Sequence, residues 1–266
     1  MGRIIAMANQ KGGVAKTTTC INLGASLAAT KRRVLLVDLD PQANATVGSG
    51  VEKGSFEKSS YHVLTGKAPA AEAILHVESA GYDILPTTGD LTAAEVELMN
   101  MMVAREQRLR QALQQVRERY DFIIIDCPPS LNMLTLNALV AADSVMIPMQ
   151  CEYYALEGLS ALVSTIEQIR STVNPKLEIE GLLRTMYDPR NNLASDVSGQ
   201  LIMHFGDKVY RTVIPRNVRL AESPSHGLPA LAYDRTSRGA VAYLALAGEI
   251  LRRYDKPHSP VAAQPH

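Results

Sequence analysis

The stretch that decides the fold is Ile4-Ile5-Ala6-Met7-Ala8 followed by Asn9-Gln10-Lys11-Gly12-Gly13-Val14-Ala15-Lys16-Thr17-Thr18-Thr19. An apolar run breaks at two adjacent glycines, reaches a lysine and continues as a segment compatible with a helix. This is the layout of a strand, a phosphate-cradling loop and a helix N-terminus. The strict pattern G-x-x-x-x-G-K-[ST] fails, because Gln10 and Ala15 occupy its two glycine positions. What remains is a variant loop with two lysines, Lys11 and Lys16.

The composition is that of an ordinary globular chain. It has 266 residues, of which 46% are hydrophobic and 20% charged, enough for one large α/β domain. Lys plus Arg equals Asp plus Glu, 27 each, so DNA binding would need a local basic patch. The three cysteines lack CxxC spacing and predict free thiols in a reducing compartment. The first residues read as a strand and no apolar run approaches ~20 residues, so we expect a cytoplasmic protein without a signal peptide.

Hydrophobic periodicity predicts strands that alternate with helices. Such alternation indicates a mostly parallel twisted sheet with helices on both faces, and we expect one domain over residues 1–254. Residues 255–266, with two histidines and three prolines, are expected to be a disordered tail. In the last helix, Val241, Leu244, Ala247 and Leu251 are expected to face inward. The predicted strands are 3–8, 34–37, 82–85, 122–125, 144–149, 177–183 and 209–214, and the predicted helices are 16–30, 91–119, 131–141, 155–171, 193–205 and 236–254.

Charged residues follow three of the predicted strands. The first strand ends in the lysine loop, the second in Asp38 and Asp40, and the strand at 122–125 in Asp126. Ligands of such sheets bind beyond the carboxyl ends of the strands. Bare backbone amides and Lys16 suit phosphates, while the hydroxyl of Thr17 and the carboxylate of Asp126 suit a metal ion. The three strand ends together therefore predict a nucleotide site, although a lone aspartate at a strand end is commonly a helix cap.

These motifs resemble those of a known family. Lys11-Gly12-Gly13-Val14-x-Lys16-Thr17-Thr18 is similar to the deviant Walker A loop of the ParA/MinD group of ATPases. Val37-Asp38-Leu39-Asp40-Pro41-Gln42 with Asn44-Ala45-Thr46 resembles their second motif, and Ile125-Asp126-Cys127-Pro128-Pro129-Ser130 their Walker B. The likeness continues through Ile214-Pro215-Arg216-Asn217-Val218-Arg219, Ser225-His226-Gly227 and Tyr233-Asp234. It covers residues 3–252 and is closest to the chromosomal ParA (Soj) branch.

The resemblance implies a P-loop ATPase with ATP and Mg²⁺ as cofactors. Lys16 and the amides of Gly12, Gly13, Val14, Ala15, Thr17 and Thr18 would hold the phosphates, with Thr17, Asp40 and Asp126 around the metal. Asp40 would also position the attacking water, whereas Asp38 is equally well explained as a cap. Lys11 would reach the partner's phosphates across a nucleotide-sandwich homodimer, much as an arginine finger does. Pro215 and Asn217 would line the adenosine pocket.

Members of this branch bind double-stranded DNA without sequence preference, through basic residues of the ATP-bound dimer. The stretch 184–238 has eight Lys/Arg and five acids, a net charge of +3. Arg190 and Arg219 match the best candidates for phosphate contacts, followed by Arg216 and Arg238. A solvated surface explains any single arginine as well. The resemblance further implies a ParB-like partner that stimulates hydrolysis, and association with the nucleoid.

Four other functions were considered for this sequence. A membrane-directed MinD-like regulator needs a C-terminal amphipathic helix, which Tyr254-Asp255-Lys256-Pro257-His258-Ser259-Pro260 cannot form. An iron–sulfur relative needs paired cluster cysteines, which Cys127 and Cys151 do not provide. The longer plasmid partition ATPases have an additional DNA-binding domain, for which there is no room before Ile4. The fourth reading is a family member that binds nucleotide poorly and acts as a binding module.

That fourth reading rests on two departures from the family pattern. The family has glycine where this chain has Ala15, and usually glycine where it has Ala43. If residue 15 needs a positive φ, alanine there costs ~1–2 kcal/mol of strain. We hypothesise that Ala15 weakens ATP binding, dimer closure or turnover without destroying the fold.

Overall fold

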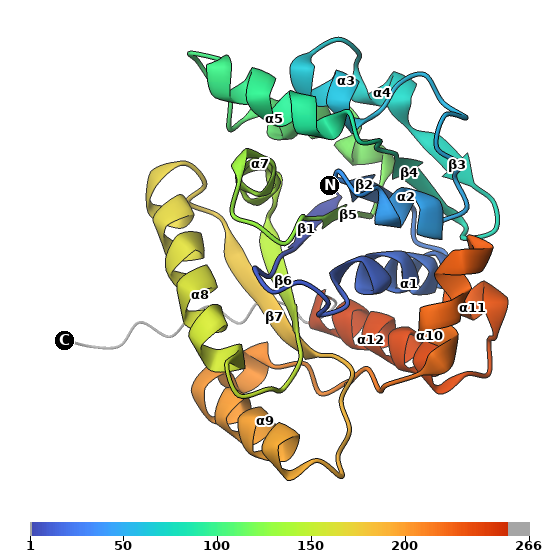
Figure 1. Cartoon of the computed structure of the whole chain (residues 1–266), viewed down its shortest axis with the longest axis vertical. Coiled ribbons are helices and arrows are strands. Elements are labelled where there is room, and N and C mark those ends of the chain that lie inside the picture. The colour runs from blue at the N-terminus through green and yellow to red at the C-terminus, as the bar shows by residue number, and fades with distance from the viewer. Residues whose placement is uncertain (1, 255–266) are drawn as a thin grey trace.

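The computed structural model describes residues 2–254, which form one seven-stranded sheet flanked by helices (Figure 1). The strand order is β3-β4-β2-β5-β1-β6-β7. Only the pair β3·β4 is antiparallel, so the predicted mostly parallel sheet is confirmed. The strands are β1 (Arg3–Met7), β2 (Val34–Asp38), β3 (Leu75–Val77), β4 (Tyr82–Leu85), β5 (Phe122–Asp126), β6 (Ser144–Met149) and β7 (Glu178–Arg184).

Helices cover both faces of this sheet, as the apolar strands require. One face packs against α1 (Lys16–Ala29), α2 (Asn44–Gly48), the short α10 (Val218–Glu222) and α11 (Ala230–Tyr233), and the long α12 (Arg238–Tyr254). The other packs against α3 (Ser60–Thr65), α4 (Ala70–Ala73), α5 (Leu91–Asn100), α6 (Arg108–Gln114), α7 (Met133–Ala141), α8 (Ala155–Thr172) and α9 (Asn192–Phe205). Three 3₁₀ turns, at Arg117–Arg119, Gly206–Lys208 and Ser223–His226, complete the described helical segments.

The central strands are buried on both sides. Every residue of β2, β5 and β6 is buried, and alternate side chains of each strand enter two separate apolar clusters. A parallel strand covered by helices on both faces can bury all its side chains, which explains its continuous apolar sequence. The same register places Met7 beside Asp126 and Asp126 beside Asp38, so the chemistry-bearing ends of β1, β5 and β2 are adjacent.

The prediction of a strand at 209–214 is wrong. In place of a strand, this segment has an isolated bridge at Val209 and two backbone hydrogen bonds to β7, donated by the N–H groups of Tyr210 and Ile214. The N–H groups of Arg211 and Thr212 donate instead to the Glu249 carboxylate, each at 2.9 Å. Because a side chain of α12 accepts these donors, the backbone is satisfied without a sheet ladder.

The predicted helix at 91–119 is interrupted. Helix α5 ends at Asn100, Ala104 has φ +54°, and the chain resumes as α6 at Arg108. Asn137 of α7 donates to the carbonyl of Arg105 and accepts the N–H of Leu109, at 2.9 and 3.2 Å. These side-chain hydrogen bonds replace helical ones. The antiparallel strand β3 was also missed.

One of the four residues predicted to face inward from α12 does not. Val241 is 53% exposed, whereas Ala247 is fully buried as predicted and Leu244 and Leu251 are half-buried. The centre of the buried face is formed by Tyr243, Leu246 and Ile250 with Ala247, so the predicted face is correct except at Val241.

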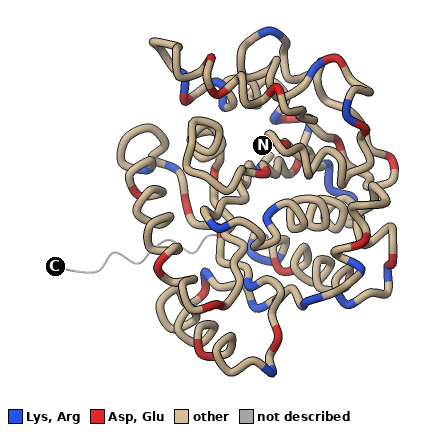
Figure 2. Tube along the Cα trace, viewed as in Figure 1, with Lys and Arg blue, Asp and Glu red and all other residues tan. Residues whose placement is uncertain are grey.

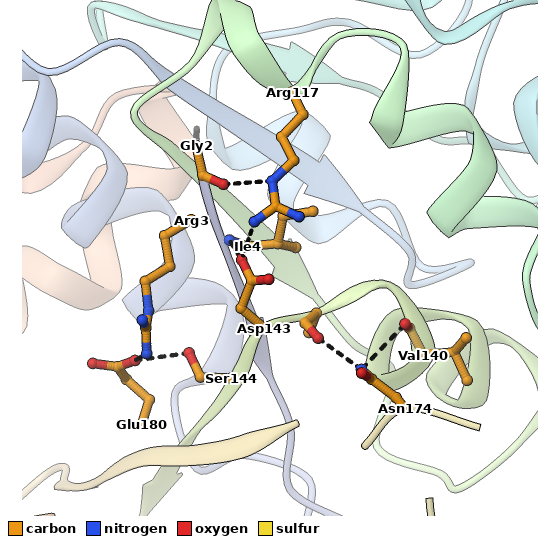
Figure 3. Close-up of polar contacts among 10 residues, drawn as sticks. Gly2, Arg3, Ile4, Arg117, Val140, Asp143, Ser144, Asn174 and Glu180 are labelled. Carbon is orange, nitrogen blue, oxygen red and sulfur yellow. Dashed lines mark hydrogen bonds and ion pairs between the residues drawn. The ribbon is translucent and has the colours of Figure 1, made fainter. Parts of the chain in front are cut away.

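Polar contacts fix the amino edge of the sheet (Figure 3). Arg3 Nη2 lies 2.9 Å from Glu180 Oε2, which also accepts the Ser144 hydroxyl at 2.7 Å. Asp143 Oδ2 accepts from Arg117 Nη2 at 2.6 Å. These pairs tie β1, β6 and β7 together at the edge opposite the lysine loop.

Charges of both signs are interspersed along the chain (Figure 2). Within residues 2–254, none of the helices has the length and apolar character needed to cross a membrane. The predicted tail at 255–266 lies outside the described residues.

Candidate nucleotide site

The loop between β1 and α1 is open on one side, and side chains that follow β6 and β7 hold its carbonyl groups. Gly13 has φ +73°, and a Cβ atom placed at Gly12 or Gly13 would meet no atom within 4 Å. Gln150 Nε2 donates to the Gly13 carbonyl at 3.2 Å, and Thr185 Oγ1 donates to the Val14 carbonyl at 3.0 Å. The loop thus leaves its outer side free for phosphate oxygens while its carbonyls are held by β6 and β7.

The sequence analysis did not predict a role for Gln150 or Thr185. Both directly follow the carboxyl ends of strands, at β6 and β7, so the rule that selected Asp126 was available for them too. Their hydrogen-bond partners in the lysine loop are more than 130 residues away along the chain, and no sequence pattern indicates such a pairing.

The two lysines occupy different environments. Lys16 is 7% exposed, and its ammonium donates to the Lys11 carbonyl at 3.2 Å. Burial lowers the pKa of Lys16, and the nearby Asp126 opposes this shift. Lys11 is exposed, and its Nζ lies 2.5 Å from Glu152 Oε2. Lys16 therefore points inward beneath the loop, whereas Lys11 stands at the surface.

Asp126 is the most unusual acid of the site. It is fully buried, and its Oδ2 has no hydrogen-bond partner, while Oδ1 accepts the Cys20 thiol at 3.5 Å. Burial, followed by the charge of Asp38, raises the pKa of Asp126, and the Thr17 hydroxyl opposes this rise. An unsatisfied buried carboxylate oxygen is costly and marks a place where a bound group would supply the missing partner.

The neighbouring aspartates differ in their hydrogen bonds. Asp38 accepts the N–H and hydroxyl of Thr46, at 2.8 and 2.7 Å, and the N–H of Asp40 at 3.1 Å. Burial raises the pKa of Asp38, and the Thr46 bonds offset part of that rise. Asp40 accepts the N–H of Gln42 at 3.0 Å. Asp38 thus acts as a structural cap for α2.

Pro215 and Asn217 lie on the segment that joins this region from the β7 side. Pro215 bridges to Tyr187, and the adjacent Met186 receives the Gln150 amide at 3.1 Å. Asn217 precedes α10, and its Oδ1 is buried without a hydrogen-bond partner. Gln150 thus contacts both the lysine loop and Met186, which places the segment containing Pro215 near the loop.

A divalent cation would find few protein ligands here. Among residues 2–254, no three His, Cys, Asp or Glu side chains gather as a metal site. Mg²⁺ commonly takes one or two protein oxygens and draws the rest from phosphates and water. Thr17 and the unpaired oxygen of Asp126 fit that limited role.

The four candidate arginines are exposed but differently paired. Arg190 forms an ion pair with Asp188 at 2.7 Å and lowers the pKa of that carboxyl to about 2. Arg219 contacts Glu222 at 2.8 Å and Asp234 at 3.2 Å. Arg216 and Arg238 make no ion pair within the described part of the chain.

The fold and the loop together define a class. Residues 2–179 match the family model described as "AAA domain", which covers the loop and both acidic strand ends. The sheet order and the glycine–lysine loop at the carboxyl edge are those of a P-loop nucleotide-binding ATPase.

Comparisons with individual proteins narrow the family. The chain is 54% identical over 250 residues to the sporulation initiation inhibitor protein Soj of Bacillus subtilis, covering 94% of this chain and 98% of Soj. It is 51% identical to the chromosome partitioning protein ParA of Caulobacter vibrioides, covering 94% of each. The chain belongs to the ParA/Soj family of chromosome-partitioning ATPases.

A solved structure supports the same fold. Cobyrinic acid a,c-diamide synthase from Mycobacterium smegmatis, with bound ADP and magnesium, superposes with a TM-score of 0.83 at 38% identity. The superposition covers 96% of each chain.

Ala15 and Ala43 both adopt the left-handed conformation. Their φ angles are +66° and +59°, and each precedes a helix of the site, α1 and α2. The positive φ on which the Ala15 hypothesis depends is therefore present. Alanine in this conformation carries ~1–2 kcal/mol of strain, which lowers the free energy of unfolding. We expect an effect on ATP to come from the methyl group itself.

We expect Ala15→Gly to tighten ATP binding or raise turnover by a few fold, because glycine removes a half-buried methyl group next to Lys16 and would leave more room for phosphates. It should also raise the free energy of unfolding by about 0.5–1 kcal/mol, since relief of strain exceeds the entropy that glycine adds to the unfolded chain. Calorimetric titration, steady-state hydrolysis and denaturant unfolding measure these changes.

Ala43→Gly is the matched control for this experiment. Its backbone is equally strained, but its side chain is fully buried, so loss of the methyl group forfeits about 0.8 kcal/mol of burial. We expect little net change in its stability. Equal ATP affinity and turnover for the native chain and Ala15→Gly would contradict the hypothesis.

Proposed function

We propose that this chain is an ATP-dependent dimerising switch that binds DNA without sequence preference. In this proposal it drives chromosome or plasmid segregation on the nucleoid, and a ParB-like partner stimulates hydrolysis and release. Soj and ParA are named for sporulation control and chromosome partitioning, which supports this assignment.

One observation carries the nucleotide part of the proposal. Lys16 is buried beneath an open glycine loop, and Asp126 beside it has a carboxylate oxygen without a partner. Triphosphate oxygens would pair with the Lys16 ammonium and the loop amides, while Mg²⁺ held by Thr17 and the phosphates would satisfy Asp126. The bound ion would neutralise charge on the phosphates.

The remaining residues would act on the attacking water and the phosphate charge. Asp40, 8% exposed at the end of the loop after β2, would orient the water. Lys11 would leave Glu152 and place its ammonium on the partner's phosphates, adding positive charge where negative charge develops. Pro215 and Asn217 would flank the adenosine.

DNA retention would rest on Arg190, Arg216, Arg219 and Arg238. Arg190 and Arg219 are held by acidic neighbours at 2.7–3.2 Å, so a phosphate would have to replace those partners. These ion pairs are solvent-exposed and therefore contribute little, so a charged hydrogen bond to phosphate readily offsets their loss.

Co-sedimentation with plasmid DNA tests the whole proposal. The chain is incubated with ATP, with ADP or without nucleotide, and the DNA-bound fraction is measured at 50 and 200 mM salt. Binding specific to ATP and steeply weakened by salt is the expected result. Equal binding in all three states would contradict the switch.

Arg219→Glu is expected to reduce DNA retention at least tenfold, with the ATP-dependent dimer intact. Its reversed charge also faces Glu222 and Asp234, so Arg216→Glu, whose side chain has no ion pair in the described structure, serves as the second variant. Arg170→Glu, exposed on α8, is the matched control. Unchanged retention by both Arg219→Glu and Arg216→Glu at low salt would place the DNA surface elsewhere.

A further inference from the structure

A second basic site lies at the far end of α1. The turn after this helix contains Lys31-Arg32-Arg33, the longest run of consecutive basic residues in the sequence, and all three are exposed. They line a hollow of about 560 Å³ together with Arg119 and the β3–β4 hairpin. Helix α1 has 14 residues, so this hollow is about 20 Å from the lysine loop. It belongs to neither the nucleotide site nor the candidate DNA arginines.

The hollow has an excess of uncompensated positive charge. Four cations line it against one acid, Asp83. Both oxygens of Asp83 are already engaged, by His76 Nδ1 at 2.7 Å and by the Tyr120 hydroxyl at 2.8 Å. Arg33 pairs with Asp121 at 3.2 Å. Lys31, Arg32 and Arg119 make no ion pair within residues 2–254.

The backbone of the turn after α1 is strained at Lys31. Lys31 has φ +65°, a conformation that glycine adopts most readily. The N–H groups of Lys31 and Arg32 donate to the carbonyls of Ala28 and Leu27, at 2.8 and 3.3 Å, which closes the helix end in a Schellman motif. A lysine therefore occupies the position that this motif usually gives to glycine.

The chemistry of the walls selects a ligand class. Three guanidinium groups and an ammonium suit phosphate oxygens, which arginine binds through paired N–H donors. The rings of Tyr82 and Tyr120 are buried, so neither is free to stack on a base. The volume lies within the range of small-molecule sites.

We propose that this hollow binds a compact phosphorylated anion through Lys31, Arg32, Arg33 and Arg119. It recognises phosphate groups and does not read a base. A duplex is a poorer fit, because the cations surround a hollow instead of lining a ridge.

Inorganic tripolyphosphate is the probe, titrated calorimetrically at 150 mM salt into the full chain. Binding should persist in Lys16→Ala, which disables the lysine loop, and weaken at least tenfold in Arg32→Glu/Arg119→Glu. Lys176→Glu/Arg170→Glu, at two exposed positions without an ion pair in the described structure, controls for the same change of four units in net charge. In ¹⁵N spectra, tripolyphosphate should shift the amides of residues 31–33.

Three outcomes would overturn the assignment. Loss of all binding in Lys16→Ala would place the phosphate in the lysine loop alone. A DNA duplex that displaces tripolyphosphate from Lys16→Ala would make the hollow part of a DNA surface. Absence of binding, with only a lower melting temperature in the double variant, would assign the cations to stabilising the carboxyl end of α1.

Discussion

Replacement of Lys16 by alanine is expected to lower ATP affinity by about a hundredfold or more. The buried ammonium lies beneath the open loop, where it would meet the terminal phosphates under the proposed function. A hydrogen bond to a charged group contributes about 1.5–3 kcal/mol, and two such bonds to phosphate oxygens account for that loss. Fluorescent-nucleotide titration measures it, and DNA retention with ATP should vanish in parallel.

The fold of the Lys16→Ala variant should survive. Within the chain the ammonium makes one hydrogen bond, to the Lys11 carbonyl, and its burial is itself costly. Circular dichroism and thermal melting verify this point. Lys176→Ala, which removes an exposed lysine after α8, should leave ATP affinity unchanged. ATP binding by Lys16→Ala within threefold of the native chain would disprove the role given to the loop.

The sequence predicted those parts of the fold that depend on local pattern. Strands β2 and β5 are unbroken apolar runs because both of their sides are buried, and that signal lies within each strand. Two of the failures involve distant partners. Glu249 accepts the N–H groups that would have formed a strand at 209–214, from 37 residues or more along the chain. Asn137 interrupts the helix at 91–119 from α7 in the same way.

The candidate site was predictable for a geometric reason. Parallel strands end at one edge, so Asp38 and Asp126 had to lie near the lysine loop once their strands were identified. The structure also shows which acid already has its hydrogen bonds. Asp38 accepts two from Thr46, whereas Asp126 has one oxygen without a hydrogen-bond partner. Hydrogen-bond partners of this kind depend on side-chain positions across the sheet, and no spacing rule reports them.

Asp40→Ala is expected to lower ATP turnover by about a hundredfold or more and to leave ATP affinity within a few fold. Loss of a residue that orients the attacking water removes a contribution of about 10²–10⁴ to the rate. The variant should therefore accumulate as an ATP-bound dimer that stays on DNA. Single-turnover hydrolysis and co-sedimentation with ATP measure the two effects.

Two further variants separate chemistry from structure at this position. Asp40→Asn keeps an oxygen to accept the Gln42 N–H, so it should lose turnover but not stability. In Asp38 both carboxylate oxygens accept hydrogen bonds, one from Thr46 and the other from the Asp40 N–H, so Asp38→Asn loses one acceptor and should lower the melting temperature. If Asp40→Asn hydrolyses ATP at the native rate, the water is oriented by another group. If Asp40→Ala releases DNA as fast as the native dimer, hydrolysis is not what ends DNA binding.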